Sequence, residues 1–541
     1  MPIISQFGGI VPRKPAHQLG ESEATIAHNV CLQNGRLEAW REREQIKKAV
    51  DNANSMYLHG CCFFSWQECV TATDYIVDWG RLYLTGRSDR PETMELNGCD
   101  ATYYYLGVPQ PQSPVTVTAT EQYGRDCAQR TYIYTYVNKF GEESSPSPPS
   151  TELTIKDGDS VYLSNFTLPP EGYGITEIWI YRSATAYRDE TVKEEDPSLT
   201  DYLKVGELVL PETTFNDTLW DKQLGSVCET REVRVPPSDL REIRHLKGHG
   251  ILTGVGKNTI HFSAPYQPHN WPAENDLTLP YDIVHAVTLD DKLFVSTNSY
   301  PYVIDAANQC EPRKCKNVID VDTPLPDIAC GYQNSAISTP FGMLYVSKDG
   351  LVLVQANGQF QIVSRQWFSS LDWRKTRPES ARLAYWRGYV VYVTDVVSLL
   401  MEIDADTYGD VRVGTLSTID DKPITMSIST NGELIMLDKD GYFYQWNTGK
   451  TYREFHWESR ELSFGHTLAP VAAKIRSMGS VKFRLYTPLQ DLYFEKVVAL
   501  ERPFRVRRMG RHLFYRVCLR GINSVDYVEL STAFFSINQG K

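Results

Sequence analysis

The sequence predicts a mainly β protein built around a β-propeller, and three observations lead to this prediction. First, strand-like pairs recur between about residues 251 and 446. Second, each pair is rich in β-branched and aromatic residues, with Gly, Asp, Asn, Ser or Pro at its middle, which is typical of a β-hairpin. Third, successive pairs start 42, 50, 46 and 45 residues apart, at Ile251, Leu293, Met343, Tyr389 and Leu434.

A period of about 40 to 50 residues with hairpins as the unit is the sequence signature of a propeller. One four-stranded blade cannot bury both of its faces alone, so blades stack in a ring. We therefore assign residues 236–456 to propeller blades. A β-sandwich, or an irregular β-domain with loosely spaced hairpins, is the alternative.

Residues 1–112 are expected to form an N-terminal arm, one short helix and several strands. The helix is predicted over residues 21–30, because Ala24, Ala27 and Cys31 would fall on one helical face. Strand-like stretches between residues 56 and 110 would supply a further blade, or the strand that closes the ring.

Residues 113–235 form a separate unit in this reading, after a stiff connector with three prolines between Val108 and Pro114. Short alternating strands over about 100 residues predict a β-sandwich. A loop at residues 188–201 carries six carboxylates. It is a candidate acidic interface, with a solvated loop as the alternative. Five of the six carboxylates form the candidate set: Asp189, Glu190, Glu194, Glu195 and Asp196.

Residues 457–541 are still strand-rich, but the hairpin period lapses there. This C-terminal β element belongs either to the ring or to a separate tip.

Composition limits the function. The chain has 541 residues and a net charge of −12, which argues against a general nucleic-acid coat but not against a protein past which DNA must move. We expect no secretory signal and no membrane-spanning segment. Eleven cysteines are an odd, scattered set. We interpret them as reduced thiols of a protein folded in a cytosol.

We predict no enzymatic activity, no metal and no cofactor. The stretch from Asp404 to Asp410 begins like a calcium loop but lacks its final glutamate, so a hairpin turn is favoured. His245 and His249 are separated by a glycine that opposes a zinc-binding helix. Buried free thiols are a better interpretation than metal ligands for the group Cys61, Cys62 and Cys69.

One cluster of charge stands out between Glu501 and Gly521. Seven arginines and one glutamate give a local charge of +6, which leaves −18 for the rest of a chain whose total is −12. Arginine forks suit phosphates and carboxylates. The cluster is a candidate contact with an acidic neighbouring subunit or with DNA, and an exposed basic strand face is the alternative; its arginines are Arg502, Arg505, Arg507, Arg508, Arg511, Arg516 and Arg520.

Several stretches, taken in order, resemble one family. FGGIVPRKP followed by EATIAHNVCLQNGRLEAWR resembles the start of tail proteins of short-tailed phages. TYIYTYVNKFGEESSPSPPS followed by YGITEIWIYRS resembles their inserted fibronectin type III-like module, and IHFSAPYQPHNWP followed by KLFVSTNSYPYVI resembles their propeller blades. The family is the podovirus tail nozzle protein, also called tail tubular protein B or tail hub. Together these stretches cover most of residues 1 to about 450.

The resemblance implies a hexameric ring below the portal and adaptor proteins of a virion tail, assembled in the host cytoplasm. It implies a channel that retains the viral DNA and conducts it on ejection, and side surfaces that hold tail fibres or tailspikes. The C-terminal 90 residues match less clearly and would form the nozzle tip. A ring needs a heterologous interface, and the arginine cluster and the acidic loop are candidate opposite faces of it.

The alternative function is a glycan-binding propeller that recognises a receptor. Aromatic loops such as Tyr266 to Trp271 would then stack on sugar rings. A propeller hydrolase is a third option, which the missing acid pair and the missing Asp-box motifs oppose.

Overall fold

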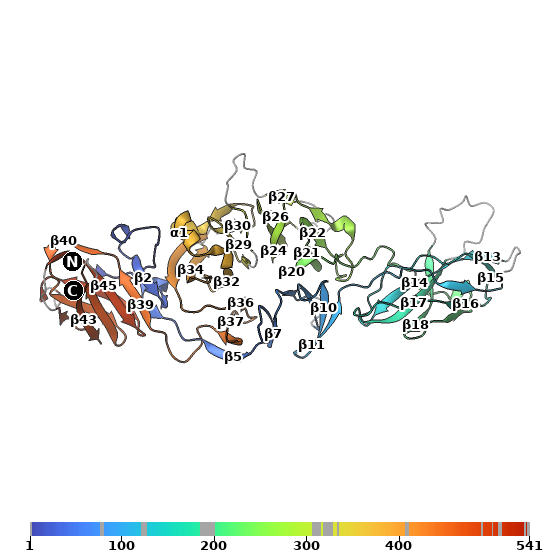
Figure 1. Cartoon of the computed structure of the whole chain (residues 1–541), viewed down its shortest axis with the longest axis horizontal. Coiled ribbons are helices and arrows are strands. Elements are labelled where there is room, and N and C mark those ends of the chain that lie inside the picture. Colours follow the sequence, from blue (N-terminus) through green and yellow to red (C-terminus); the bar gives the residue numbers. More distant parts are fainter. Residues whose placement is uncertain are drawn as a thin grey trace. The chain divides into compact units, whose positions relative to one another are not determined.

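The computed structural model divides the chain into two compact units, and each is described by itself. The first comprises Met1–Cys69, Tyr281–Asp305 and Cys315–Lys541, and the second Val70–Pro280 and Ala306–Lys314. Strands dominate both units (Figure 1). The residues described are 3–75, 80–120, 127–183, 201–305, 315–317, 328–332, 335–405, 411–487, 491–499, 501–506, 511–534 and 537.

All five predicted hairpins are confirmed, and each supplies the two middle strands of a four-stranded antiparallel sheet, which for β32 to β35 is one end of a ten-stranded sheet. Four of these sheets lie in the first unit. They are β24 to β27 (Ile283–Leu289, Lys292–Thr297, Tyr302–Asp305, Cys315–Asn317), β28 to β31 (Ala336–Thr339, Gly342–Ser347, Gly350–Gln355, Phe360–Ile362), β32 to β35 (Arg382–Trp386, Tyr389–Val393, Ser398–Ala405, Val411–Thr418), and β36 to β38 (Thr425–Ile428, Leu434–Leu437, Tyr442–Gln445) with β5 (Glu44–Lys48).

These four sheets stack face to face like propeller blades. Alternate residues of one middle strand enter different cores: in β29, Met343 and Tyr345 pack toward the β24–β27 sheet, whereas Leu344 and Val346 pack toward the β32–β35 sheet. The first strands of successive sheets also contact one another. Both faces of each middle strand are therefore buried, which is the radial arrangement of a propeller.

An early strand completes the last of these sheets. The strand β5 pairs with β38, about 400 residues later in the chain. The strand that completes this sheet therefore lies before residues 56–110, where a closing strand is expected. The hairpin β6–β7 (Ser55–His59, Cys62–Trp66) follows and packs on the same sheet through Phe63 and Phe443, whose ring centroids are 5.4 Å apart.

The helix predicted over residues 21–30 is wrong. These residues form the strand β2 (Ala24–His28), followed by the short pair β3 (Val30–Cys31) and β4 (Glu38–Ala39). A β-bulge between Ala24 and Ile26 turns both Ala24 and Ala27 toward the core. The bulge therefore produces a three-residue spacing of buried positions that resembles a helical period. The α-helix α1 (Ser370–Lys375) is capped by Ser369.

The C-terminal residues form a sandwich with the N-terminal segment, and both chain ends lie in it (Figure 1). One sheet has the order β1-β46-β41-β44, and the other continues from β35 through β2-β39-β45-β42-β43, with β40 on β45. Their bounds are β1 (Ile3–Ile4), β39 (Phe455–Ser459), β40 (Leu462–Leu468), β41 (Ala472–Ser477), β42 (Val481–Tyr486), β43 (Leu492–Val498), β44 (Phe504–Arg505), β45 (His512–Gly521) and β46 (Val525–Ser531).

The second unit contains two more four-stranded sheets of the same kind, β8 to β11 and β20 to β23. The first strands of the two sheets contact each other, and Tyr83, Ile243 and Leu252 lie in the core that they share. The strands are β8 (Thr71–Thr73), β9 (Arg81–Thr85), β10 (Glu92–Asn97), β11 (Asp100–Tyr105), β20 (Arg241–Leu246), β21 (Ile251–Val255), β22 (Thr259–Phe262) and β23 (Leu277–Thr278). A further blade-like sheet between residues 56 and 110 is thus confirmed.

The predicted β-sandwich is also in the second unit. Two three-stranded antiparallel sheets, β12-β16-β19 and β14-β17-β18, enclose one core, and β13-β15 adds a hairpin-like pair. The strands are β12 (Thr116–Thr118), β13 (Cys127–Arg130), β14 (Tyr132–Asn138), β15 (Leu153–Lys156), β16 (Val161–Ser164), β17 (Ile175–Ser183), β18 (Tyr202–Val209) and β19 (Phe215–Asp217).

No helix among the described residues has both the length and the apolar character that crossing a membrane requires.

Candidate functional site: a charged cleft

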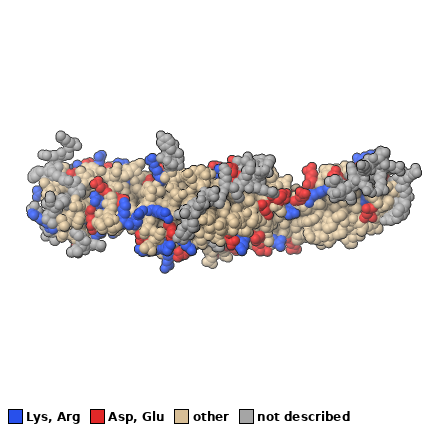
Figure 2. All heavy atoms as spheres, turned by 90° about the horizontal axis from the view of Figure 1, so that it is seen from above, with Lys and Arg blue, Asp and Glu red and all other residues tan. Residues whose placement is uncertain are grey.

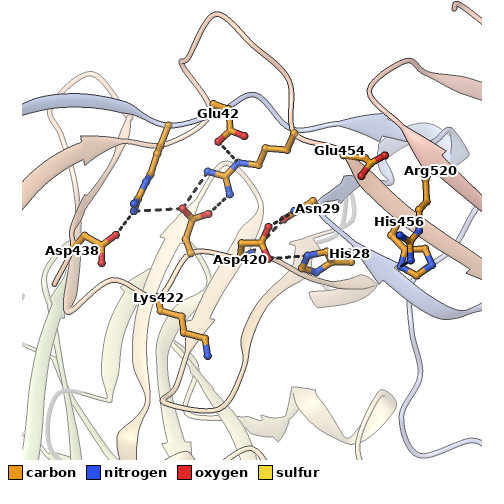
Figure 3. A pocket seen from close by; sticks show the side chains of 12 residues that line it. His28, Asn29, Glu42, Asp420, Lys422, Asp438, Glu454, His456 and Arg520 are labelled. Carbon is orange, nitrogen blue, oxygen red and sulfur yellow. Dashed lines mark hydrogen bonds and ion pairs between the residues drawn. The ribbon is translucent and has the colours of Figure 1, made fainter. Parts of the chain in front are cut away.

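A charged cleft of about 650 Å³ opens in the first unit, where the β36–β38 sheet meets the terminal sandwich (Figure 3). Six separate segments contribute to it, from β2 near the start of the chain to β45 near its end. Its lining residues are polar or charged: His28, Asn29, Glu42, Arg43, Asp420, Asp421, Lys422, Asp438, Arg453, Glu454, His456 and Arg520.

The floor of the cleft is a buried ion pair centred on Asp421. The carboxylate accepts hydrogen bonds from two nitrogens of Arg453, one of them at 3.1 Å, and from the indole Nε1 of Trp446 at 2.9 Å. Arg43 lies 3.8 Å away and also donates to Asp438. The side chains of Asp421 and Arg453 are 4 and 5% exposed. Each charge in the floor is therefore matched by an opposite charge, as burial requires.

One wall joins the N-terminal segment to the loop after β35. Asp420 accepts from Asn29 at 2.6 Å and lies 3.0 Å from Nε2 of His28. Burial alone would raise the pKa of Asp420, but these two partners outweigh it, so the pKa of Asp420 is lowered. The carboxylate therefore stays charged and joins Asp420 by a hydrogen bond to Asn29, about 390 positions earlier in the chain.

The same wall continues across the sheet: His28 of β2 pairs in register with His456 of β39, and His456 with Arg520 of β45. The Nη2 of Arg520 lies 3.4 Å from Nδ1 of His456. Burial, and then the positive charges of Arg520, His28 and Arg484, lower the pKa of His456 to about 4. The imidazole is therefore neutral at neutral pH, and its Nδ1 accepts a hydrogen bond from the guanidinium.

This histidine should make stability depend on pH. The folded pKa of about 4 lies below the ordinary 6.5, so unfolded chains bind the proton first, and stability present above pH 6.5 is lost as the pH falls toward 4. We expect His456→Gln to reduce the fall in the free energy of unfolding between pH 7 and 4 by about 1 kcal/mol. Urea unfolding of both proteins at intervals between pH 7 and 4 measures it. An unchanged pH dependence in the variant would show that His456 is not the group responsible.

The lining of the cleft holds no serine, threonine or cysteine, and two of its arginines bind carboxylates in the pairs Arg453–Asp421, Arg453–Glu42 and Arg43–Asp438. A neighbouring set, His456, Glu458 and Cys518, has ligand atoms within 4.8 Å of one another. However, Glu458 accepts from Arg516 at 2.7 Å, and burial raises the pKa of the Cys518 thiol to about 11. A protonated thiol beside two arginines is a poor metal ligand.

The described strand members of the predicted arginine cluster are divided between two sheets. Arg516 and Arg520 lie on β45, with Arg520 lining the cleft, whereas Arg505 lies on β44 in the other sheet, its guanidinium 5.1 Å from the ring of Phe534. Arg502, Arg505 and Arg511 are exposed. The remaining pair, Arg507 and Arg508, lies outside the described residues. So does the whole acidic set Asp189, Glu190, Glu194, Glu195 and Asp196.

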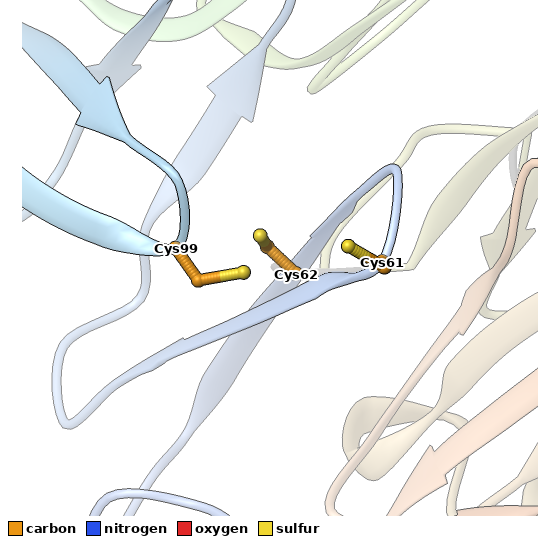
Figure 4. A group of neighbouring side chains, drawn as sticks. All are labelled: Cys61, Cys62 and Cys99. Carbon is orange, nitrogen blue, oxygen red and sulfur yellow. The ribbon is translucent and has the colours of Figure 1, made fainter.

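The prediction of reduced thiols is wrong for two cysteines. Cys62 and Cys99 are each disulfide-bonded, and pairing of this kind cannot be deduced from sequence spacing. Cys62 is buried at the start of β7, and the neighbouring Cys61 is exposed and free (Figure 4). The prediction of buried free thiols for Cys61, Cys62 and Cys69 is therefore wrong, because Cys62 is disulfide-bonded and the other two are exposed. Free thiols are buried at other positions, and burial raises the pKa of Cys31, Cys228 and Cys518.

Two further predicted sites have structural outcomes. His245 is buried in β20 against the ring of Tyr75, and burial lowers its pKa to about 4. Trp271 of the proposed sugar-stacking loop is buried, and its Nε1 donates to the carbonyl of Pro268 at 2.9 Å. The indole ring is thus part of the core rather than a platform for sugars, although Tyr266 is exposed. The calcium-like stretch lies mostly outside the described residues.

No family model matches the chain, and no curated protein matches it. Solved structures share a weak likeness. A streptogramin B lyase aligns over 76% of this chain and 99% of its own, at 10% identity and a TM-score of 0.31. The extracellular domain of a putative hybrid two-component system from B. thetaiotaomicron aligns over 82% of this chain and 43% of its own, at 9% identity and a TM-score of 0.30. The Neurospora crassa Pan2 WD40 domain aligns over 75% of this chain and 99% of its own, at 8% identity and a TM-score of 0.28. Likeness of this degree identifies no family and no activity.

Proposed function

We propose that the chain is a tail nozzle subunit of a short-tailed phage. In this role it forms a hexameric ring below the portal and adaptor, extends the DNA conduit, retains the genome and conducts it on ejection, and anchors tail fibres or tailspikes. The sequence resemblance over residues 1 to about 450 is the main support. The sandwich of residues 113–235 would be the fibronectin type III-like insert of that family.

The structural observation that carries the proposal is an open sheet edge beside a basic face. Among the described residues β43 ends its sheet, and its Leu492 and Val497 are 53 and 62% exposed. Natural edge strands are usually protected by charge, by proline or by a covering segment. An edge with exposed apolar side chains fits contact with a neighbouring copy.

The outward face of the same sheet carries more cations than anions. Lys482 of β42 and Arg520 of β45 are opposite each other in the strand register. Nε of Arg484 donates to Oε2 of Glu495 at 2.6 Å. This basic face consists of Lys482, Arg484, Arg516 and Arg520, set against Glu458 and Glu495. Elsewhere acidic and basic side chains are interspersed, as Figure 2 illustrates for one side. In a chain of net charge −12, a basic face can meet an acidic patch of the next copy, as a heterologous ring interface requires.

We expect Leu492→Glu combined with Val497→Glu to weaken ring assembly at least about tenfold, because the pair removes apolar contact and places charge at the interface. Native mass spectrometry and negative-stain microscopy of the full-length chain measure this. The matched control is Leu168→Glu, since Leu168 is equally exposed on the sandwich of the second unit. Assembly that survives the double substitution would rule out this edge as the interface.

The proposal as a whole is tested by the copy number of the chain in purified particles. Quantitative mass spectrometry should find about half as many copies as portal subunits. Absence of the chain from the particle would refute the virion role.

A further inference from the structure

The strand β2 joins two parts of the first unit. In its ten-stranded sheet, β2 lies between β35, the last strand of a propeller blade, and β39 of the terminal sandwich. The parallel register of β2 with β35 is a single residue pair, His28 with Thr418. Nδ1 of His28 also lies 2.9 Å from the hydroxyl of Thr418, and its Nε2 lies 3.0 Å from Asp420. This junction therefore depends on a few polar contacts of His28 and its neighbour Asn29.

A row of basic side chains crosses the sheet at this junction. His28 of β2 is opposite His456 of β39, which is opposite Arg520 of β45. Lys482 of β42 continues the row beside Arg520. Residues that are opposite in register point to the same face of a sheet, with their Cβ atoms about 4.5–5.5 Å apart. Protonation of His456 therefore removes the acceptor of Arg520 and places a positive charge directly opposite its guanidinium, which destabilises the strand pairing.

The carboxylates around His456 give little compensation for such a charge. Glu458 lies 2.7 Å from Arg516, and Asp420 binds His28 and Asn29. Glu454 is exposed, so water screens its charge. On the strands and loops next to His456, the charged and titratable groups are His28 on β2, Arg516, Cys518 and Arg520 on β45, Lys482 and Arg484 on β42, Glu454 and Glu458 on its own segment, and Asp420 after β35.

Of the two strands that flank β39, β2 is held more weakly on its other side. There β45 pairs with β42 along the whole of that strand, whereas β2 pairs with β35 through one residue pair. The buried side chains of β2 are also small: Ala24 and Ala27 are each 1% exposed. Leaving a core exposes little apolar area in an alanine, and the loss is about 25 cal/mol per Å². Repulsion along the row is therefore relieved most easily by separation of β2 from β39.

We propose that β2 is an acid-sensitive latch: as the pH falls, positive charge along the row of His28, His456 and Arg520 releases β2 from β39 and loosens the β32–β35 sheet from the terminal sandwich. All three side chains line the charged cleft, so protons reach them in the folded protein. Burial and the neighbouring cations lower the pKa of His456 to about 4. An opened strand therefore takes up a proton that the closed sheet resists, and release begins below pH 6.5 and increases toward pH 4. This inference goes beyond the proposed nozzle function and does not depend on it.

Hydrogen–deuterium exchange of the full-length protein, followed by mass spectrometry, tests the latch. Exchange is compared at pH 7 and pH 5 after correction for the intrinsic exchange rate of free amides, which itself depends on pH. We expect the protection of β2 to fall about tenfold between these two values, because the opened strand binds the proton more tightly. At pH 5, β2 should also be less protected than β29 of a neighbouring blade, since β2 opens without unfolding of the whole unit.

Two variants separate the row from other effects of pH. His456→Gln can still accept from Arg520 but takes up no proton, so the fall in β2 protection should shrink to less than about threefold. His28→Gln should shrink it in the same direction. The control is His17→Gln, an exposed histidine of the same unit, which should keep the tenfold fall.

The latch is refuted if β2 keeps its protection at pH 5, or if β2 and β29 lose protection to the same level together. It is equally refuted if both glutamine variants respond to pH as the unmodified protein does. Should one glutamine variant fail to fold at pH 7, the other variant and the unmodified protein still decide the outcome.

Discussion

Replacing Asp421 with alanine is expected to destabilise the first unit by about 3–5 kcal/mol. The substitution leaves the buried guanidinium of Arg453 with only the half-exposed Glu42, 3.4 Å away, and deprives Trp446 of its acceptor. An uncompensated buried charge is far more costly than a lost surface pair. Guanidinium unfolding followed by tryptophan fluorescence measures the loss, since Trp446 lies in the affected core.

The neighbouring carboxylate provides a control. Asp420 is adjacent in sequence and also lines the cleft, but its side chain is 68% exposed. Asp420→Ala should cost less than about 1 kcal/mol, as exposed pairs do. Equal losses in the two variants would show that burial of the ion pair does not determine its contribution.

Replacing Asp217 with alanine should unfold the sandwich of the second unit, with a loss of about 3–5 kcal/mol. Its carboxylate, fully buried, accepts from Arg182 at 2.7 Å and from the hydroxyl of Tyr132 at 2.8 Å. Arg182 also donates to Asp221, which Arg130 reaches at 2.8 Å. Without Asp217, the fully buried guanidiniums of Arg130 and Arg182 keep only two carboxylate partners, Asp157 and Asp221. Both of these are partly exposed.

Hydrogen exchange of the strands β14 and β17 reports this loss, because Tyr132 and Arg182 are paired in register there. Glu207→Ala on β18 is the control: its pair with Lys204 at 3.2 Å is exposed, and exchange should be unaffected. Protected strands in the Asp217→Ala protein would contradict the proposed importance of the buried network.

The middle strands of the blades could be predicted from the sequence because both of their faces are buried. Stretches such as Met343–Val354 are therefore almost continuously apolar between turns. The outer strands have weaker patterns: β36, for example, has no fully buried residue. β2 was mistaken for a helix because its bulge changes the spacing of buried residues, and no local signal marks a bulge of that kind.

The charged cleft could not be predicted. Its residues come from six segments, and each carboxylate or arginine looks like a surface residue until its partner is known. The stretch from Asp420 to Lys422 carries three adjacent charges, which is the one local hint of a polar site. The arginine cluster shows the converse: arginines that are close in sequence, such as Arg505 and Arg516, lie on strands of different sheets.

The interleaving of early and late strands has a consequence for biosynthesis. The strand β1 pairs with β46, β2 with β39, and β5 with β38. A ribosome therefore releases the first fifty residues long before their partners are made. Bringing such distant segments together is slow, and meanwhile β2 and β5 remain open edges that can pair wrongly or with another chain. We expect the first unit to complete its folding only after translation ends. Chaperones that bind exposed strands should raise the yield of folded protein.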